Sequence, residues 1–296
     1  MKELCILDGG MGQELLARSK REVTPLWSAD VMLHEPELVR DLHVDFIKSG
    51  AQVITMNTYT ATPQRLERDG TTEHFVELHE KAGWAALQAR SIGGVSNIKI
   101  AGCLPPLVAS YRPEAVLSFD ESLATYRQLA AIQEPFCDLF ICETMSSIVE
   151  AKAACQAAKE VEKPVWLAFT VKDDASRQLR SSESLADAVS ALLALKPDAI
   201  LLNCSAPEAI SLCWPILQSA DVPVGAYANG FTSVDTLYPG DTVTKLEKRK
   251  DLSPLEYVKH AQKWVQRGAS IVGGCCEIGP EHIKALNMSL KAQSSD

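Results

Sequence analysis

Short apolar runs alternate with longer amphipathic stretches along nearly the whole chain of 296 residues. A strand-like run followed by a helix-like stretch, repeated, predicts parallel strands joined by right-handed crossovers. Eight such units favour a closed (β/α)8 TIM barrel over an open sheet, and a barrel of this kind fits the chain length. The sequence therefore predicts an α/β fold with a single barrel domain spanning residues 1–296. The expected strands are Leu4–Leu7, Gln52–Met56, Ile98–Cys103, Leu139–Cys142, Val165–Phe169, Ala199–Leu202, Val222–Ala226 and Ser270–Val272.

Several amphipathic stretches carry helix start and stop signals. Ser253-Pro254 places proline at a first helical position, and Gly50 and Gly268 stand where a helix C-cap is expected. The expected helices are Pro36–Ser49, Glu73–Ser91, Asp120–Pro135, Ser147–Val161, Ser182–Leu195, Pro207–Ser219, Pro254–Arg267 and Pro280–Leu290.

Composition excludes several classes of function. With 29 basic and 38 acidic residues the formal charge is −9, and nothing in the sequence forms a basic stripe. Nucleic acid and membrane surfaces are therefore excluded as expected partners. No run approaches the roughly 18 apolar residues of a membrane span, and the first residues lack a signal-peptide core. Nine cysteines without a secreted-framework spacing indicate a reducing compartment, so we expect a cytoplasmic protein, either a monomer or a small homo-oligomer.

Polar residues follow several of the apolar runs. In a TIM barrel the C-terminal ends of the strands form one face, where active sites lie. We therefore expect these side chains, among them the substrate-contact candidates Asn57 and Asn203, to converge on one pocket, although each asparagine alone can equally be a capping residue. The set is Asp8, Asn57, Glu143, Asn203, Cys204, Asn229, Cys275 and Cys276.

Three of these residues are thiols. Cys275 and Cys276 follow Ile271-Val272-Gly273-Gly274, and Cys204 ends another apolar run. Three thiolates with an open fourth position can hold a catalytic Zn²⁺ ion, which removes the proton of a bound substrate thiol. A closed structural site is disfavoured because a fourth regularly spaced cysteine ligand is missing, whereas a vicinal disulfide between Cys275 and Cys276 stays open. The remaining cysteines are expected to be small buried hydrophobes, as most such cysteines are: Cys5, Cys103, Cys137, Cys142, Cys155 and Cys213.

The glycine-rich stretch Asp8-Gly9-Gly10-Met11-Gly12 follows the first apolar run. Its backbone amides can form an anion-binding concavity, and the spacing matches neither a dinucleotide fingerprint nor a P-loop. A carboxylate is the natural guest, while Asp8 and Glu143 can hold an ammonium group. Together with zinc for a side-chain sulfur, these residues describe a pocket for a thiol amino acid. A plain glycine-rich turn with an N-capping Asp8 is an equally good interpretation of this stretch alone.

Taken in order, the motifs resemble the homocysteine S-methyltransferase family over about Leu4 to Leu286. The resemblance implies a zinc-dependent barrel that methylates L-homocysteine to methionine, with Cys204, Cys275 and Cys276 as zinc ligands. It also implies that Asp8 and Glu143 bind the amine, and that backbone amides near Gly9 and Gly10 bind the carboxylate. The motifs are Asp8-Gly9-Gly10, Pro25-Leu26-Trp27-Ser28-Ala29, Thr55-Met56-Asn57-Thr58-Tyr59, Cys142-Glu143-Thr144, Asn203-Cys204 and Gly273-Gly274-Cys275-Cys276.

The stretch Pro25–Ala29 is similar to the branch of the family that uses sulfonium donors, S-methylmethionine and less efficiently S-adenosylmethionine. Trp27 and Tyr59 suit a cationic donor because aromatic faces stabilise such cations, although Trp27 can equally be a packing residue. Residues Tyr227–Phe231 lack a proline common in that family loop. Two alternatives remain: a thiol or selenol methyltransferase using betaine or a corrinoid-bound methyl group, and a non-enzymatic zinc or thiol-redox protein. The segment Thr232–Leu252 is expected to be either a lid or a plain surface excursion.

Overall fold

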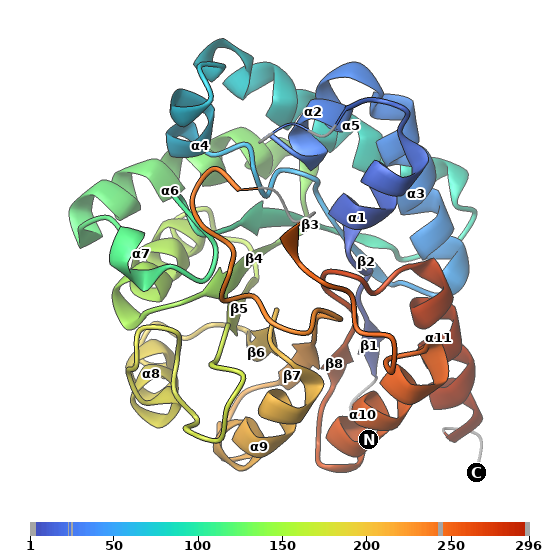
Figure 1. Ribbon diagram of the computed structural model, residues 1–296, viewed down its shortest axis with the longest axis vertical. Coiled ribbons are helices and arrows are strands. Elements are labelled where there is room, and N and C mark those ends of the chain that lie inside the picture. The colour runs from blue at the N-terminus through green and yellow to red at the C-terminus, as the bar shows by residue number, and fades with distance from the viewer. Residues whose placement is uncertain (1–3, 23, 25, 242–244, 294–296) are drawn as a thin grey trace.

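The computed structural model describes residues 4–22, 24, 26–241 and 245–293. Its centre is one sheet of eight parallel strands in the order β1-β8-β7-β6-β5-β4-β3-β2, surrounded by helices (Figure 1). This confirms the predicted (β/α)8 fold, and each strand overlaps the run that predicted it. The strands are β1 Cys5–Ile6, β2 Val53–Thr55, β3 Lys99–Leu104, β4 Leu139–Met145, β5 Val165–Phe169, β6 Ala199–Asn203, β7 Val224–Tyr227 and β8 Ile271–Val272.

The barrel closes between its first two strands. Leu7 forms a parallel bridge with Val53, and the amide of Asp8 donates to the carbonyl oxygen of Val53 at 3.0 Å. The amide of Gln52 donates to the carbonyl oxygen of Ile6 at 2.7 Å. Closure brings the C-terminal ends of all strands to one rim, which is the condition for a shared site.

Helices follow the strands and cover the outside of the barrel (Figure 1). All eight predicted helices are present, and α3 has the predicted bounds. The helices are α1 Met11–Arg18, α2 Ser28–His34, α3 Pro36–Ser49, α4 Pro63–Arg68, α5 Phe75–Ile92, α6 Phe119–Gln133, α7 Ile148–Lys159, α8 Leu185–Leu193, α9 Pro207–Gln218, α10 Pro254–Gln266 and α11 Pro280–Gln293, with 3-10 turns η1 Thr72–His74, η2 Pro113–Ala115 and η3 Glu134–Phe136.

Local chemistry explains where helices begin and end. A capping box starts α6, because the Ser118 hydroxyl accepts from the amide of Glu121 and the Glu121 carboxylate accepts in return. Gly50 ends α3 in the left-handed region at φ 113°. The predicted start of α8 at Ser182 is three residues early, because Ser182 has φ 72° and the hydroxyl of Ser184 caps the helix. Helices α1, α2 and α4 lie in βα segments for which no helix was predicted.

Apolar side chains pack on both faces of the strands. Two apolar clusters alternate along the strands. The first and smaller cluster includes Leu7, Ile141 and Leu201, and the second and larger cluster packs under the helices. Because side chains of a strand alternate between its two faces, the first cluster fills the barrel and the second anchors the helices.

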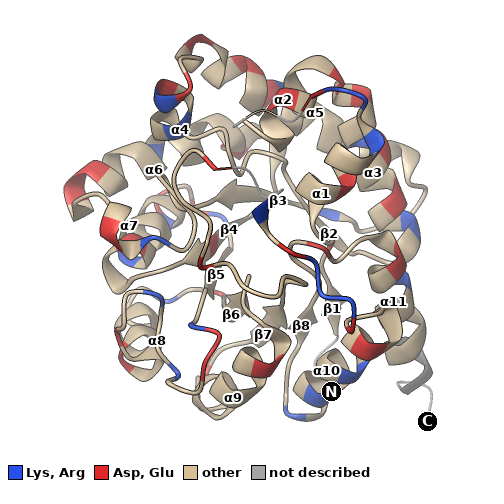
Figure 2. Cartoon of the chain, in the orientation of Figure 1, with Lys and Arg blue, Asp and Glu red and all other residues tan. Residues whose placement is uncertain are grey.

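Acidic and basic residues are both distributed over the outer helices (Figure 2). Among the described residues, no helix is long and apolar enough to cross a membrane.

Candidate active site

A cavity opens at the C-terminal rim of the barrel. Residues from the ends of β1, β2, β4, β6, β7 and β8 line it, as the barrel fold predicts. Ten of the eleven predicted site residues line this cavity: Asp8, Gly9, Gly10, Trp27, Asn57, Tyr59, Glu143, Cys204, Cys275 and Cys276.

Asn203 is the predicted contact that does not line the cavity. Its side chain is fully buried, its Oδ1 accepts from the amide of Thr144 at 2.9 Å, and its Nδ2 donates to the hydroxyl of Thr144 at 2.9 Å. Both ends of this amide are therefore used to tie β6 to the end of β4. Asn203 positions the residues next to it, Cys204 and Glu143, and a direct substrate contact is not supported.

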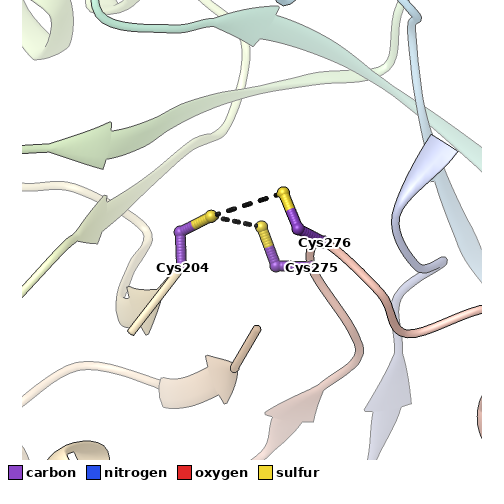
Figure 3. A group of neighbouring side chains, drawn as sticks. All are labelled: Cys204, Cys275 and Cys276. Carbon is purple, nitrogen blue, oxygen red and sulfur yellow. Dashed lines mark hydrogen bonds between the residues drawn. The ribbon is translucent and has the colours of Figure 1, made fainter. Parts of the chain in front are cut away.

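The three predicted metal-binding thiols meet at one point (Figure 3). The Sγ of Cys204 lies 2.7 Å from the Sγ of Cys275 and 3.9 Å from that of Cys276, and all three sulfurs lie within 4.8 Å of one another. Sulfurs about 2.3 Å from a tetrahedral metal ion are roughly 3.8 Å apart. The Cys204–Cys276 pair already fits this spacing, and the Cys204–Cys275 pair needs to open by about 1 Å. Three soft donors with space on the cavity side therefore fit a metal ion that keeps an open position.

Hydrogen bonds make Cys204 the most acidic of the three thiols. Burial raises the pKa of Cys204, but hydrogen bonds from Cys275, Cys276 and Tyr111 outweigh burial and lower that pKa well below its usual value. The Tyr111 hydroxyl lies 2.9 Å from the Cys204 sulfur. The site therefore favours thiolate at Cys204, which is the form that binds metal.

Strained backbone surrounds the thiols. Cys204 has φ 49°, Thr144 has φ 62°, Tyr111 has φ 63° and Trp27 has φ 53°, all in the left-handed region that non-glycine residues rarely adopt. Such strain costs roughly 1–3 kcal/mol per residue and persists where surrounding structure enforces it. Six other non-glycine residues of the described chain also have positive φ, so the strain shows that the fold enforces these four positions and does not by itself mark the functional end.

Two acidic residues, the buried Asp8 and the partly exposed Glu143, lie beside the thiols on the cavity wall. Asp8 accepts from the amide of Thr55 at 2.7 Å and from its hydroxyl at 3.3 Å. Burial, together with the charge of Glu143, raises the pKa of Asp8 to about 8. Burial likewise raises the pKa of Glu143 to about 7. Two such carboxyls without a cation partner are costly to ionise, and an ammonium group would relieve this cost.

Two residues that support Glu143 were not identified from the sequence. The thiol of Cys103 donates to Glu143 Oε1 at 3.0 Å, and the hydroxyl of Tyr227 donates to Oε2 at 3.3 Å. Cys103 is buried as expected, but it is more than a small hydrophobe because it orients this carboxylate. The alternation of side chains along a strand could have identified Cys103. Ala101 faces the barrel interior, so Cys103, two residues further along β3, faces it too.

The glycines after β1 serve packing first. A Cβ atom on Gly9 would lie 2.0 Å from the carbonyl oxygen of Ile278, and one on Gly10 would lie 2.5 Å from that of Cys275. The Gly10 N–H donates to the Ile278 carbonyl at 2.9 Å and is therefore already used, while carboxylate binding by backbone amides near Gly9 and Gly10 stays a prediction. Asp8 does not cap α1, since the N-cap is Gly10 and no side chain caps it. The uncapped first turn of α1 at Met11 and Gly12, both on the cavity wall, offers amides to an anion instead.

Aromatic side chains line another wall of the cavity. Trp27 and Tyr59 meet edge to face with ring centroids 6.5 Å apart, and Trp27 packs where a Cβ atom on Gly12 would stand. The Nδ2 of Asn57 donates to the carbonyl oxygen of Ser28 at 3.1 Å, which holds the β2 end against α2. Pro25, the first residue of the motif that contains Trp27, lies outside the described residues.

The segment after β7 folds over the cavity. Residues 237–241 line it, and the orange segment of Figure 1 crosses the barrel mouth. Arg112 holds this segment: its Nε donates to the carbonyl oxygen of Leu237 at 2.8 Å, and its guanidinium lies 4.0 Å from the centroid of the Tyr238 ring. A plain surface excursion is therefore excluded for residues 237–241; residues 242–244 of the same loop are outside the described residues.

Comparison with known proteins agrees with this geometry. The family model described as homocysteine S-methyltransferase matches residues 5–290. The chain belongs to the homocysteine S-methyltransferase family. A homocysteine S-methyltransferase from Escherichia coli (strain K12) is 30% identical over 304 residues, which cover 96% of this chain and 94% of the relative. Homocysteine S-methyltransferase 3 from Zea mays is 29% identical over 309 residues, which cover 96% of this chain and 89% of the relative.

A solved member of the homocysteine S-methyltransferase family has the same architecture. The crystal structure of the homocysteine methyltransferase MmuM from Escherichia coli, in its metallated form, superposes with a TM-score of 0.81 at 25% identity. The alignment covers 97% of this chain and 96% of MmuM. MmuM was solved in a metallated form, and this chain carries three clustered thiols at the rim of the same fold.

Proposed function

We propose that this protein is a zinc-dependent methyltransferase that moves a methyl group from a sulfonium donor to the thiol of L-homocysteine, giving methionine. S-methylmethionine is the proposed donor, and S-adenosylmethionine a less efficient one. The observation that carries the proposal is the cluster of Cys204, Cys275 and Cys276 opening into a cavity that also holds Asp8 and Glu143.

Zinc is proposed as the metal because it is borderline-soft and a thiolate-rich donor set favours it over harder divalent ions. When bound, it supplies Lewis acidity that makes a substrate thiol lose its proton near neutral pH. Cys204, Cys275 and Cys276 would hold it. Tyr111 fixes the orientation of Cys204 through its hydroxyl, and the strained backbone at Cys204 directs the sulfur toward the pair on the β8 side.

The chain's own residues would orient the acceptor. Asp8 and Glu143 would bind the ammonium group of homocysteine, since burial raises the pKa of both carboxyls and neither is paired with a lysine or arginine among the contacts of the described residues. The first-turn amides of α1 would bind the carboxylate. These two contacts fix the amino-acid end, so that the side-chain sulfur extends toward the three cysteines.

Trp27 and Tyr59 are the proposed contacts of the donor cation, because aromatic faces stabilise a sulfonium. The homocysteine thiolate attacks the methyl carbon and forms a new carbon–sulfur bond. The old bond breaks with its electron pair going to the donor sulfur, which leaves as a neutral thioether. Nothing is oxidised or reduced. Positioning the two reacting atoms within about 3–3.5 Å supplies much of the rate.

We also propose that residues 1–296 form one domain, since strands from both ends of the chain complete one sheet. A cytoplasmic location is proposed because Cys204, Cys275 and Cys276 are free thiols and must stay reduced to bind metal. A monomer or small homo-oligomer that binds small molecules is the proposed assembly.

A donor panel with metal analysis tests the proposal. We expect one zinc per chain after dialysis under reducing conditions, and methionine formation from homocysteine with S-methylmethionine faster than with betaine or methylcobalamin. Running selenocysteine in parallel tests the selenol alternative. Zinc that survives dialysis, with no methionine formed from any donor, would favour the thiol-redox or zinc-storage alternative and overturn the enzyme proposal.

A further inference from the structure

Arg65 places a buried positive charge on the cavity wall. It belongs to α4, lines the cavity and has only 8% of its surface exposed. One of its terminal nitrogens donates to the carbonyl oxygen of Pro106 at 3.0 Å and to the hydroxyl of Ser110 at 3.4 Å. Its guanidinium also lies 5.5 Å from the centroid of the Tyr59 ring. The group is therefore held in place by neutral partners.

Arg65 forms no ion pair among the contacts of the described residues, although the buried carboxyl of Glu150 lies close enough to interact with its charge. Its Nε is buried and has no hydrogen-bond partner among the described residues. Burial lowers the pKa of Arg65 and outweighs the opposing effects of Tyr59 and Glu150, while the positive charge of Arg68 lowers that pKa further. By contrast, Arg68 on the same helix is paired with both carboxylate oxygens of Asp69 at 2.8 Å. A buried cation without a counter-ion is costly, and an anionic ligand would offset that cost.

The charge of Arg65 is separated from the negative groups by aromatic side chains. Tyr59, under the guanidinium, shares a 2.8 Å hydrogen bond with Ser110, and the next residue, Tyr111, contacts the Cys204 sulfur. Cys204, Asp8 and Glu143 line the same cavity and carry negative charge once ionised. A donor with a cationic methyl-bearing centre and a terminal anion can place its anion near Arg65 and its cationic centre near these negative groups. The reverse orientation would bring like charges together.

We propose that Arg65 binds the carboxylate of the methyl donor, so that the enzyme selects onium donors that carry a carboxylate and holds their methyl-bearing centre toward Cys204. This inference rests on the proposed methyl transfer. It adds a specificity residue to it, because donor binding then depends on an anionic end as well as on the cation. Planar guanidinium suits a carboxylate, which it can bind through two nitrogens.

Binding measurements on the zinc-loaded protein test this without turnover. Calorimetry would compare S-methylmethionine, its methyl ester, betaine and trimethylsulfonium on the wild type, Arg65→Gln and Arg65→Lys. We expect Arg65→Gln to weaken S-methylmethionine at least about tenfold and to leave trimethylsulfonium within about twofold. The ester should bind the wild type about as weakly as S-methylmethionine binds Arg65→Gln. Arg65→Lys should recover part of the loss, since it restores charge without the fork.

Arg127→Gln is the control, because it removes a guanidinium that is paired with Glu160 on the exposed face of α6 and is not among the described residues that line the cavity; donor affinity should change less than about twofold. Equal weakening of all donors by Arg65→Gln would show a structural role and overturn the proposal. Weaker homocysteine binding with unchanged S-methylmethionine binding would assign Arg65 to the acceptor and also overturn it. If Arg65→Gln does not fold, the difference in affinity between S-methylmethionine and its methyl ester, measured on the wild type and on Arg65→Lys, decides the question. Comparing the affinities for betaine and S-methylmethionine separates ammonium donors from sulfonium donors. If no methionine forms with any donor, the proposed methyl transfer is overturned, whereas the binding result for Arg65 is unaffected.

Discussion

The Sγ atom of Cys204 lies 2.7 Å from the Sγ atom of Cys275, although 71 residues separate them in the chain. Their strands, β6 and β8, are not neighbours, because β7 lies between them in the sheet. The contact therefore depends on the left-handed backbone at Cys204 and on the turn after β8, which together carry both sulfurs past the end of β7. A metal ion at this point would link the end of β6 to the end of β8 across β7.

Replacing a single site thiol should remove the metal. We expect Cys204→Ser, Cys275→Ser and Cys276→Ser each to lose bound zinc and to lower kcat/KM at least about a hundredfold, because two thiolates hold zinc far less tightly than three. Elemental analysis after dialysis and initial rates with homocysteine measure the two effects. Cys155→Ser, at a buried thiol on α7, is the control and should keep its metal. A site variant that retained one zinc per chain would show that its cysteine is not a ligand.

The barrel and its thiol cluster follow from the sequence because each rests on a strong local signal. Buried parallel strands read as continuous apolar runs, and a polar residue that ends such a run must lie on the C-terminal rim. That reasoning predicts from the sequence alone that Glu143, Cys204 and Cys275 lie in one cavity. It fails for Asn203, which ends β6 as predicted but whose amide is consumed by Thr144.

Other parts of the site could not be inferred because they depend on contacts between loops. Arg112 and Tyr238 meet across 126 positions of sequence, and neither belongs to a periodic pattern. The unpaired state of Arg65 likewise depends on where Pro106 and Ser110 place their oxygens. The use of the Gly10 amide by Ile278 is a packing fact that glycine spacing does not encode.

Affinity for the amino-acid product should rise with pH. Burial raises the pKa of Glu143 to about 7 and that of Asp8 to about 8, so both carboxyls are largely protonated at pH 6 and must ionise to bind an ammonium group. We expect the Kd for methionine to fall about tenfold or more between pH 6 and pH 8. Methionine is the right ligand for calorimetry because it has no thiol proton to lose.

Glu143→Gln separates this effect from general pH sensitivity. The variant should bind methionine more weakly at pH 8, show a flatter pH profile and retain its zinc, because Glu143 is not a metal ligand. A profile as steep as that of the wild type would remove Glu143 from amine binding. Loss of zinc in this variant would instead mean that the carboxylate supports the thiol cluster.

Loosening the segment over the cavity should weaken substrate binding. Arg112 donates to the Leu237 carbonyl at 2.8 Å and stacks on Tyr238, so Arg112→Gln removes both a charge-assisted hydrogen bond and a cation–π contact. We expect KM for donor and acceptor to rise roughly three- to thirtyfold with zinc content unchanged. Arg127→Gln, on the exposed face of α6 and paired with Glu160, is the control. Unchanged KM values would show that the segment does not help to enclose the substrates.

Stability should fall with rising pH because of Glu150, a buried carboxyl outside the cavity lining. The amide and the hydroxyl of Ser146 both donate to its Oε2 at 2.9 Å, yet burial raises the pKa of Glu150 from 4.5 to about 7. Between these values the folded state holds a proton that the unfolded state has released. The contribution of Glu150 to the free energy of unfolding is therefore largest below pH 4.5 and declines between pH 4.5 and about 7, by on the order of 3 kcal/mol.

Glu150→Gln tests this sign directly, because glutamine keeps an acceptor oxygen for Ser146 and cannot ionise. Urea unfolding at pH 4.5, 6 and 8 should show a variant that matches the wild type at the lowest pH and exceeds it at the highest. Glu160→Gln is the opposing control: the hydrogen bond from Arg127 lowers the pKa of Glu160, so its contribution is lost as pH falls, not as it rises. Parallel profiles for wild type and Glu150→Gln would mean that Glu150 is ionised in the folded protein at neutral pH, with Ser146 and the nearby charge of Arg65 outweighing its burial.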